Sequence, residues 1–69
     1  MYLVIELQKT GNQVANIVTT YENKNEADNK YYTILAAAAI SSVERHAVTM
    51  LSDNGFCLMS AYYDHDTEE

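Results

Sequence analysis

One helical pattern lies between two hairpin patterns in this chain, and this order allows few folds. The helix is predicted at about residues 26–41, where four consecutive alanines favour helix formation. Asn25 is the predicted N-cap, because an Asn side chain accepts a hydrogen bond from the first helical turn. Five residues repeat at the spacing of one buried helix face: Ala27, Tyr31, Ile34, Leu35 and Ala38. A single helix with one buried face has to pack on a sheet built from both hairpins.

The first hairpin pattern precedes the helix. Residues 2–8 and 13–21 have the composition and alternation of strands, and Gly11 in the polar link between them can supply the positive φ of a turn. Three apolar residues of the first strand share one face: Leu3, Ile5 and Leu7. The second strand carries apolar residues on both faces, so we expect both faces of this hairpin to be at least partly covered.

The second hairpin pattern follows the helix, with strands predicted at residues 46–52 and at about 56–63. The Asn54-Gly55 dipeptide between them predicts a two-residue type I′ turn. That turn fixes four predicted cross-strand pairs: Leu51 with Leu58, Met50 with Met59, Val48 with Ala61 and His46 with Tyr63. Neither face of this hairpin is clearly polar.

These patterns predict an α+β fold: a two-layer β-β-α-β-β domain, with one helix packed on one face of an antiparallel sheet. The domain is expected to span residues 1–63, and residues 64–69 to form a frayed acidic tail.

A chain of 69 residues buries little surface, and such domains often need a disulfide, a metal or a second subunit. Cys57 is the only cysteine, which excludes an internal disulfide and favours a reducing compartment. We therefore expect a cytoplasmic homodimer.

The charge balance argues against two classes of partner. The chain has ten acidic and four basic residues and a net charge of −6, and its basic residues are scattered. Nucleic-acid binding and anionic membrane surfaces both rely on clustered Lys and Arg, so neither is expected. No apolar stretch approaches the roughly 20 residues of a membrane span, and the start of the chain lacks the features of a signal peptide.

The chemistry-bearing residues do not form a recognisable catalytic or metal-binding pattern. Cys57 and His46 are predicted too far apart along the hairpin for a nucleophile and its base. His46, Tyr63 and His65 could gather near two aspartates of the tail, but their spacing matches no known set of metal ligands. We predict no enzymatic activity, no metal and no cofactor.

Binding through the sheet is the remaining class of function. One helix can cover only one face of four strands, so an apolar face is left over. The predicted interface lies around the second hairpin and consists of Val48, Met50, Met59, Tyr62 and Tyr63. The six tyrosines are compatible with three roles: a protein interface, a base-stacking surface, or half-buried side chains with their hydroxyls in water. The missing basic groove weighs against stacking.

A resemblance adds context to this prediction. The segments Asn25-Glu26-Ala27, Lys30-Tyr31-Tyr32-Thr33-Ile34-Leu35-Ala36-Ala37-Ala38-Ala39-Ile40-Ser41 and His46-Ala47-Val48 resemble a group of short proteins of similar length. These proteins occur in gut Gram-positive bacteria and their phages or mobile elements. The resemblance covers most of the chain and carries no site residues. It implies an accessory protein that binds and blocks a host or competitor protein, such as a nuclease of a defence system.

We therefore predict a homodimeric, non-enzymatic protein-binding module, encoded by a mobile element and acting as an inhibitor. The alternative is a protein that binds or sequesters a nucleotide or metabolite. Its pocket would lie between helix and sheet or between subunits.

Overall fold

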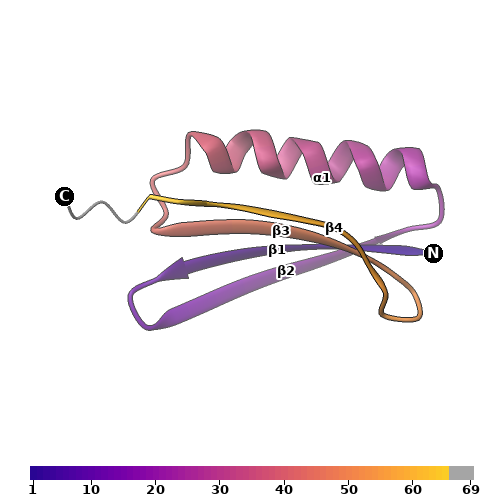
Figure 1. Cartoon of the computed structure of the whole chain (residues 1–69), viewed down its shortest axis with the longest axis horizontal. Coiled ribbons are helices and arrows are strands. Elements are labelled where there is room, and N and C mark those ends of the chain that lie inside the picture. Colours follow the sequence, from indigo (N-terminus) through magenta and orange to yellow (C-terminus); the bar gives the residue numbers. More distant parts are fainter. Residues whose placement is uncertain (66–69) are drawn as a thin grey trace.

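The computed structural model describes residues 1–65, and it confirms the α+β fold. Five elements follow one another in the predicted order: β1 (Tyr2–Thr10), β2 (Gln13–Tyr21), α1 (Lys24–Ala39), β3 (Arg45–Ser52) and β4 (Cys57–Asp64). The four strands form one sheet in the order β2-β1-β3-β4, and every neighbouring pair is antiparallel. The helix α1 packs along one face of this sheet (Figure 1).

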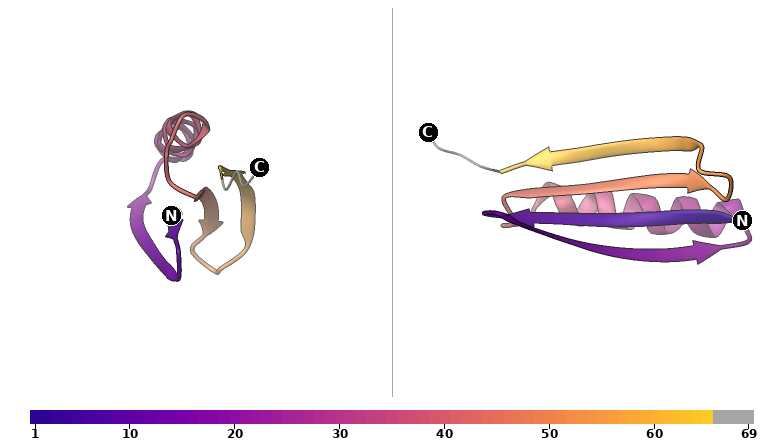
Figure 2. Two further views of the ribbon diagram at one scale, coloured as in Figure 1. Left: turned by 90° about the vertical axis from the view of Figure 1, so that its left-hand side faces the viewer. Right: turned by 90° about the horizontal axis from the view of Figure 1, so that it is seen from below.

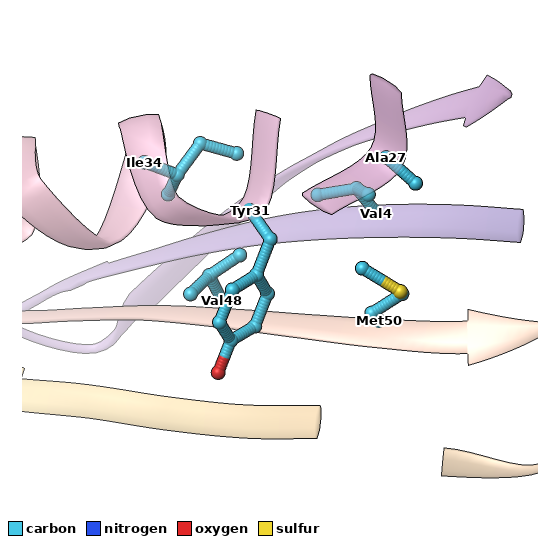
Figure 3. Close-up of a cluster of buried hydrophobic side chains, with 6 residues drawn as sticks. All are labelled: Val4, Ala27, Tyr31, Ile34, Val48 and Met50. Carbon is cyan, nitrogen blue, oxygen red and sulfur yellow. The ribbon is translucent and has the colours of Figure 1, made fainter. Parts of the chain in front are cut away.

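The core lies between α1 and the two central strands. Four of the five residues predicted for the buried helix face are buried, and the fifth, Leu35, is partly buried against the core. Six side chains form the main cluster, three from α1 and three from β1 and β3: Ala27, Tyr31, Ile34, Val4, Val48 and Met50 (Figure 3). The apolar residues that recur about every 3.6 positions in the helix therefore pack against those that recur every two positions in the strands.

The helix begins earlier than predicted. Asn23, not Asn25, is the N-cap: its backbone is extended, and its side-chain Oδ1 accepts a hydrogen bond of 2.7 Å from the Asn25 N–H. The polar run before the helix contains more than one good capping residue, and only the packing of the first turn selects among them. The last helical residue is Ala39 rather than a residue near Ser41.

Replacing the two asparagines separately tests this assignment. Asn23→Ala removes the capping acceptor and should lower the free energy of unfolding by about 1 kcal/mol. Asn25→Ala should change it by less than about 0.5 kcal/mol, because the exposed Asn25 donates to the cap through its backbone only. Urea unfolding followed by circular dichroism measures both values. A larger loss for Asn25→Ala would contradict the cap.

The turn of the second hairpin differs from the predicted type I′. That turn needs a positive φ at both central residues, but among the described residues only Gly11 and Gly55 have one. Instead, the Ser52 N–H bonds to the Phe56 carbonyl at 2.8 Å, and this bond encloses three residues, 53–55, with Gly55 at φ 88°. The longer loop shifts the pairing by one residue, so that Leu51 lies opposite Cys57 rather than Leu58.

An irregularity in the pairing then restores the predicted register. The shift lies between Met50 and Leu51, and it leaves Leu58 as the extra residue of β4. Beyond it, three predicted pairs are confirmed: Met50 with Met59, Val48 with Ala61 and His46 with Tyr63. The turn and the bulge compensate each other, so the hairpin has its predicted faces from the Met50–Met59 pair onward, whereas Cys57, predicted on the face of Met50, lies opposite Leu51 on the other face.

The folded part of the chain extends past residue 63. Asp64 is the last residue of β4 and pairs with Arg45 at 2.9 Å. The His65 N–H donates to the Glu44 carbonyl at 2.7 Å, and the His65 ring is bonded to the Ala38 carbonyl near the end of α1. The predicted tail boundary at residue 64 is therefore too early, and the remaining predicted tail, residues 66–69, lies outside the described residues. Within the described part of the chain, α1 is too short and too polar to cross a membrane.

Candidate functional site

The face of the sheet opposite α1 is not covered by any element of residues 1–65. Seen from below, all four strands lie in front of the helix (Figure 2, right). Because successive strand residues point to opposite faces, Val4 of β1 lies under the helix and its neighbours Leu3 and Ile5 lie on the other side. We call this second side the open face.

The registers of the strands arrange the open face in rows across the sheet. Three successive rows, read from β2 towards β4, are Thr20-Leu3-Leu51, Val18-Ile5-Thr49-Ser60 and Asn16-Leu7-Ala47-Tyr62. Apolar side chains therefore occupy the middle of the face, and polar residues without charge lie among them. The central residues Leu3, Ile5 and Leu7 are only partly buried, because nothing packs on them from outside.

A charged row closes one end of the open face. It contains Val14, Lys9, Arg45 and Asp64, one residue from each strand. The Arg45 guanidinium pairs with Asp64, and its carbon lies 5.5 Å from the centre of the Tyr62 ring. The Lys9 ammonium lies 3.5 Å from a Glu44 carboxylate oxygen. These charges are paired, and the apolar rows above them are the part of the face free to bind.

The structure divides the five predicted interface residues between the two faces. Val48 and Met50 are 0% exposed in the core beneath α1, so the prediction that they lie on the surplus face is corrected. Met59 is partly buried against the same core, and Tyr63, 42% exposed, is on the helix side opposite His46. Tyr62 alone lies on the open face, and it is 61% exposed. Both faces of the hairpin carry apolar side chains, although the open one also carries Thr49, Ser60 and the Arg45–Asp64 pair, and the position of α1 shows which face is covered.

No family model, curated protein or solved structure matches this chain. The candidate site therefore rests on the geometry of the chain itself. The residues that sequence reasoning missed are the open-face residues of β1 and β3, above all Leu3, Ile5, Leu7 and Leu51. The alternation of these apolar residues along each strand was visible in the sequence. That alternation did not indicate on which face of the sheet the helix would pack.

A buried polar cluster under α1 was also missed. The His46 ring nitrogen Nε2 lies 2.6 Å from a Glu6 carboxylate oxygen, and Gln8 donates to the same oxygen at 3.0 Å. Since an ionised carboxylate only accepts hydrogen bonds, the His46 Nε2 carries the proton. The other His46 nitrogen, Nδ1, has no hydrogen-bond partner among the described residues. Residues 6 and 46 are far apart in sequence, and only the β1–β3 register brings them together.

The cluster changes the acidity of Glu6. Burial alone would raise the pKa of this carboxyl, but the hydrogen bonds from His46 and Gln8 and the electrostatic attraction of His46 and Lys30 outweigh it. The pKa of Glu6 is therefore lowered, and the side chain stays ionised under the helix. His46 is 5% exposed and the Glu6 side chain 17%, so the pair is largely shielded from solvent and we assign it a structural role.

A groove lies between the first turns of α1 and the end of β2. It has a volume of about 470 Å³ and is open to solvent. All of its lining residues carry a polar group: Tyr21, Asn23, Asn25, Glu26, Asn29, Lys30 and Thr33. Neither member of the Glu6–His46 pair lines it. The groove fits the predicted place of a small-molecule pocket, between helix and sheet.

The two histidines considered for a metal site have other contacts, His46 with Glu6 and His65 with Tyr63 and Ala38. The His65 ring stacks on Tyr63, with ring centres 6.2 Å apart, and bonds to the end of α1. Among residues 1–65, no three His, Cys, Asp or Glu side chains are grouped closely enough to hold a metal ion. Cys57 is exposed at the start of β4.

Proposed function

We propose that this protein is a non-enzymatic binding module that covers an apolar surface of a partner protein with its open face. The observation that carries the proposal is the continuous band of apolar side chains on that face, from Leu3 and Leu51 to Tyr62. An uncovered apolar patch bordered by polar residues is typical of a protein-interaction site. Because such a module acts by covering its target, we expect it to inhibit that target in the cytoplasm.

The size of the open face fits this role. Four strands about 4.8 Å apart and the three uncharged rows about 7 Å apart give a face of about 19 Å by 21 Å, or about 400 Å². The largest apolar patch of a monomeric protein is commonly about 300–600 Å² and often functional. Within residues 1–65, the two basic side chains of the end row are paired, Lys9 with Glu44 and Arg45 with Asp64. An apolar patch on the partner is therefore the surface that fits.

Two adjacent tyrosines of β4 test the proposal, since they lie on opposite faces of the sheet. Tyr62→Ala removes an aromatic contact from the open face and should weaken partner binding at least about 10-fold. Tyr63→Ala, on the helix side, should leave binding within about 2-fold of the wild type. The variants serve as matched baits for the partner in host extract, followed by titration of the purified partner. Equal retention on the Tyr62→Ala bait would contradict the open face as the contact surface.

Small-molecule binding is the second candidate function, and the groove beside α1 favours it. A volume of about 470 Å³ lies within the range of ligand pockets. A nucleotide or metabolite that binds there should raise the melting temperature of the wild type. Lys30→Ala should abolish that rise, since Lys30 supplies a positive charge in the groove lining. A screen without any shift would speak against this candidate.

A further inference from the structure

We infer that a second copy of this chain pairs with the free edge of β2 and joins two sheets into one of eight strands. The strand β2 forms one edge of the sheet, and it is nine residues long. Its register with β1 is unbroken from Gln13 to Tyr21. It contains no charged residue and no proline, although the chain carries a net charge of −6. The occupant proposed for this edge is the β2 strand of another copy.

Natural sheets protect their edges, and the two edges of this sheet differ in that respect. Charges, prolines, bulges and short strands are the usual means, because they prevent pairing with another chain. The edge strand β4 has an irregular pairing near Leu51 and ends in Asp64, which is held by Arg45. None of these means is present in β2. An unprotected strand of this length is a template for one more strand.

The hairpin turn determines which backbone groups of β2 point to the free edge. The loop between β1 and β2 contains two residues, and Gly11 supplies its positive φ of 60°. Such a turn is closed by a bond from the Gln13 N–H to the Thr10 carbonyl, which directs Gln13 towards β1. Since the direction alternates along an antiparallel strand, four residues direct their N–H and C=O groups outwards: Val14, Asn16, Val18 and Thr20.

These outward groups are self-complementary around a two-fold axis at Ile17. In this register all nine residues overlap: Asn16 lies opposite Val18 of the partner subunit, and Val14 lies opposite Thr20 of the partner subunit. The four outward residues of each copy can then exchange eight hydrogen bonds across the seam. Ile17 would meet its own copy at a position where antiparallel side chains lie closest, and it is 55% exposed in the single chain.

Charge also favours this edge as the meeting point of two copies. Two chains with a net charge of −6 repel each other over most of their surfaces. Every residue of β2 is uncharged, so no like charges face each other across the proposed seam. The β2 strand of a second copy also has the side-chain pattern that suits the edge. Its valines would extend the apolar open face, and Gln13 and Thr19 would lie on the other face of the sheet, the side of α1 and the groove.

Pairing of the edges would enlarge the surface proposed to bind a partner. One open face of about 400 Å² falls short of the roughly 800 Å² that each partner contributes to a standard protein interface. Two faces joined in one sheet provide about 800 Å², which matches it. This gain in area rests on the proposed function, whereas the pairing of the two edges does not. The oligomeric state therefore tests the pairing independently of any partner.

Proline at position 16 is the sharpest test, with threonine as its matched control. Asn16→Pro removes an outward N–H and leaves the bonds to β1 intact, and proline is tolerated on edge strands. The wild type should sediment as a dimer of twice 7.8 kDa at concentrations on the order of 10 µM. Asn16→Pro should sediment as a monomer, with the dimer dissociation constant raised at least about 100-fold. Asn16→Thr keeps the N–H and should remain a dimer.

Hydrogen exchange supplies a measurement that does not depend on a variant folding. The amides of Asn16 and Val18 should exchange slowly in the wild type, and faster on dilution. A wild type that is monomeric at these concentrations, or outward amides that exchange freely, would overturn the pairing. A dimer that survives Asn16→Pro but is lost in Leu7→Lys would instead assign the contact to the two open faces. Loss of partner binding in Tyr62→Ala, by contrast, bears only on the proposed function.

Discussion

Met50→Ala should lower the free energy of unfolding by about 2–5 kcal/mol. Met50 is 0% exposed and is the largest fully buried side chain of the described residues. It lies between β1, β3 and α1, where the loss of its side chain leaves a cavity that the neighbouring residues cannot fill (Figure 3). The total stability of a 69-residue domain is about 3–10 kcal/mol, so this single change removes a large share of it.

Urea unfolding at a fixed protein concentration measures the loss as a lower midpoint with an unchanged slope. Ile40→Ala is the control, because Ile40 is also a large apolar residue but is 88% exposed at the end of α1. It should change the free energy of unfolding by less than about 0.5 kcal/mol. If Met50→Ala unfolds at the wild-type midpoint and only loses affinity for a partner, Met50 belongs to an interface and the core assignment fails.

Glu6→Gln should cost about 1.5–3 kcal/mol of stability at pH 7, and the difference from the wild type should shrink in acid. The neutral amide loses the charge-assisted hydrogen bond with His46, which lies under α1. The pKa of Glu6 is lowered in the fold from an ordinary value of 4.5. A lowered carboxyl pKa stabilises the fold fully above pH 4.5, and this stabilisation is lost as the pH falls through the folded pKa. Below it, both proteins carry a neutral side chain at position 6.

Thermal unfolding from neutral to acidic pH tests the sign of this dependence. Glu44→Gln is the matched control, since the pKa of Glu44 is also lowered, by the Gly11 N–H and by Lys9. Glu44 joins two surface loops rather than the layers of the core, so its replacement should have a much smaller effect at every pH. A difference between wild type and Glu6→Gln that stays constant into acid would show that the Glu6 charge does not stabilise the fold.

The sequence predicted the elements of this fold because each has a strong local signal. The alanine run and the spacing of Tyr31 and Ile34 predicted α1, and alternation with glycine turns predicted both hairpins. Local signals were weaker at the boundaries. Several polar residues could cap α1, and Asn54-Gly55 is compatible with more than one turn. In both cases the chain adopts the alternative that suits the packing of the neighbouring element.

The candidate site could be predicted only in part. The sequence indicated that one apolar face would be left over, since one helix cannot cover both sides of four strands. It placed Met50 and Val48 on that face, although they lie in the core. Tyr62 was predicted correctly as a residue of the second hairpin and lies on the open face, next to Ala47 of β3. The Glu6–His46 pair had no sequence signal, because it depends on the pairing of two strands from different hairpins.

The sequence by itself determined the helix, the two hairpins and the existence of an uncovered apolar face. These features follow from local periodicity and turn chemistry, which act between residues close in the chain. Only the tertiary structure decided the strand order β2-β1-β3-β4, the side on which α1 packs and therefore which apolar residues face water. The second hairpin carries apolar side chains on both faces, Val48 and Met50 on one and Leu51 and Tyr62 on the other, so their presence did not by itself choose between the faces. The choice follows from the fit of Ala27, Tyr31 and Ile34 against Val4, Val48 and Met50.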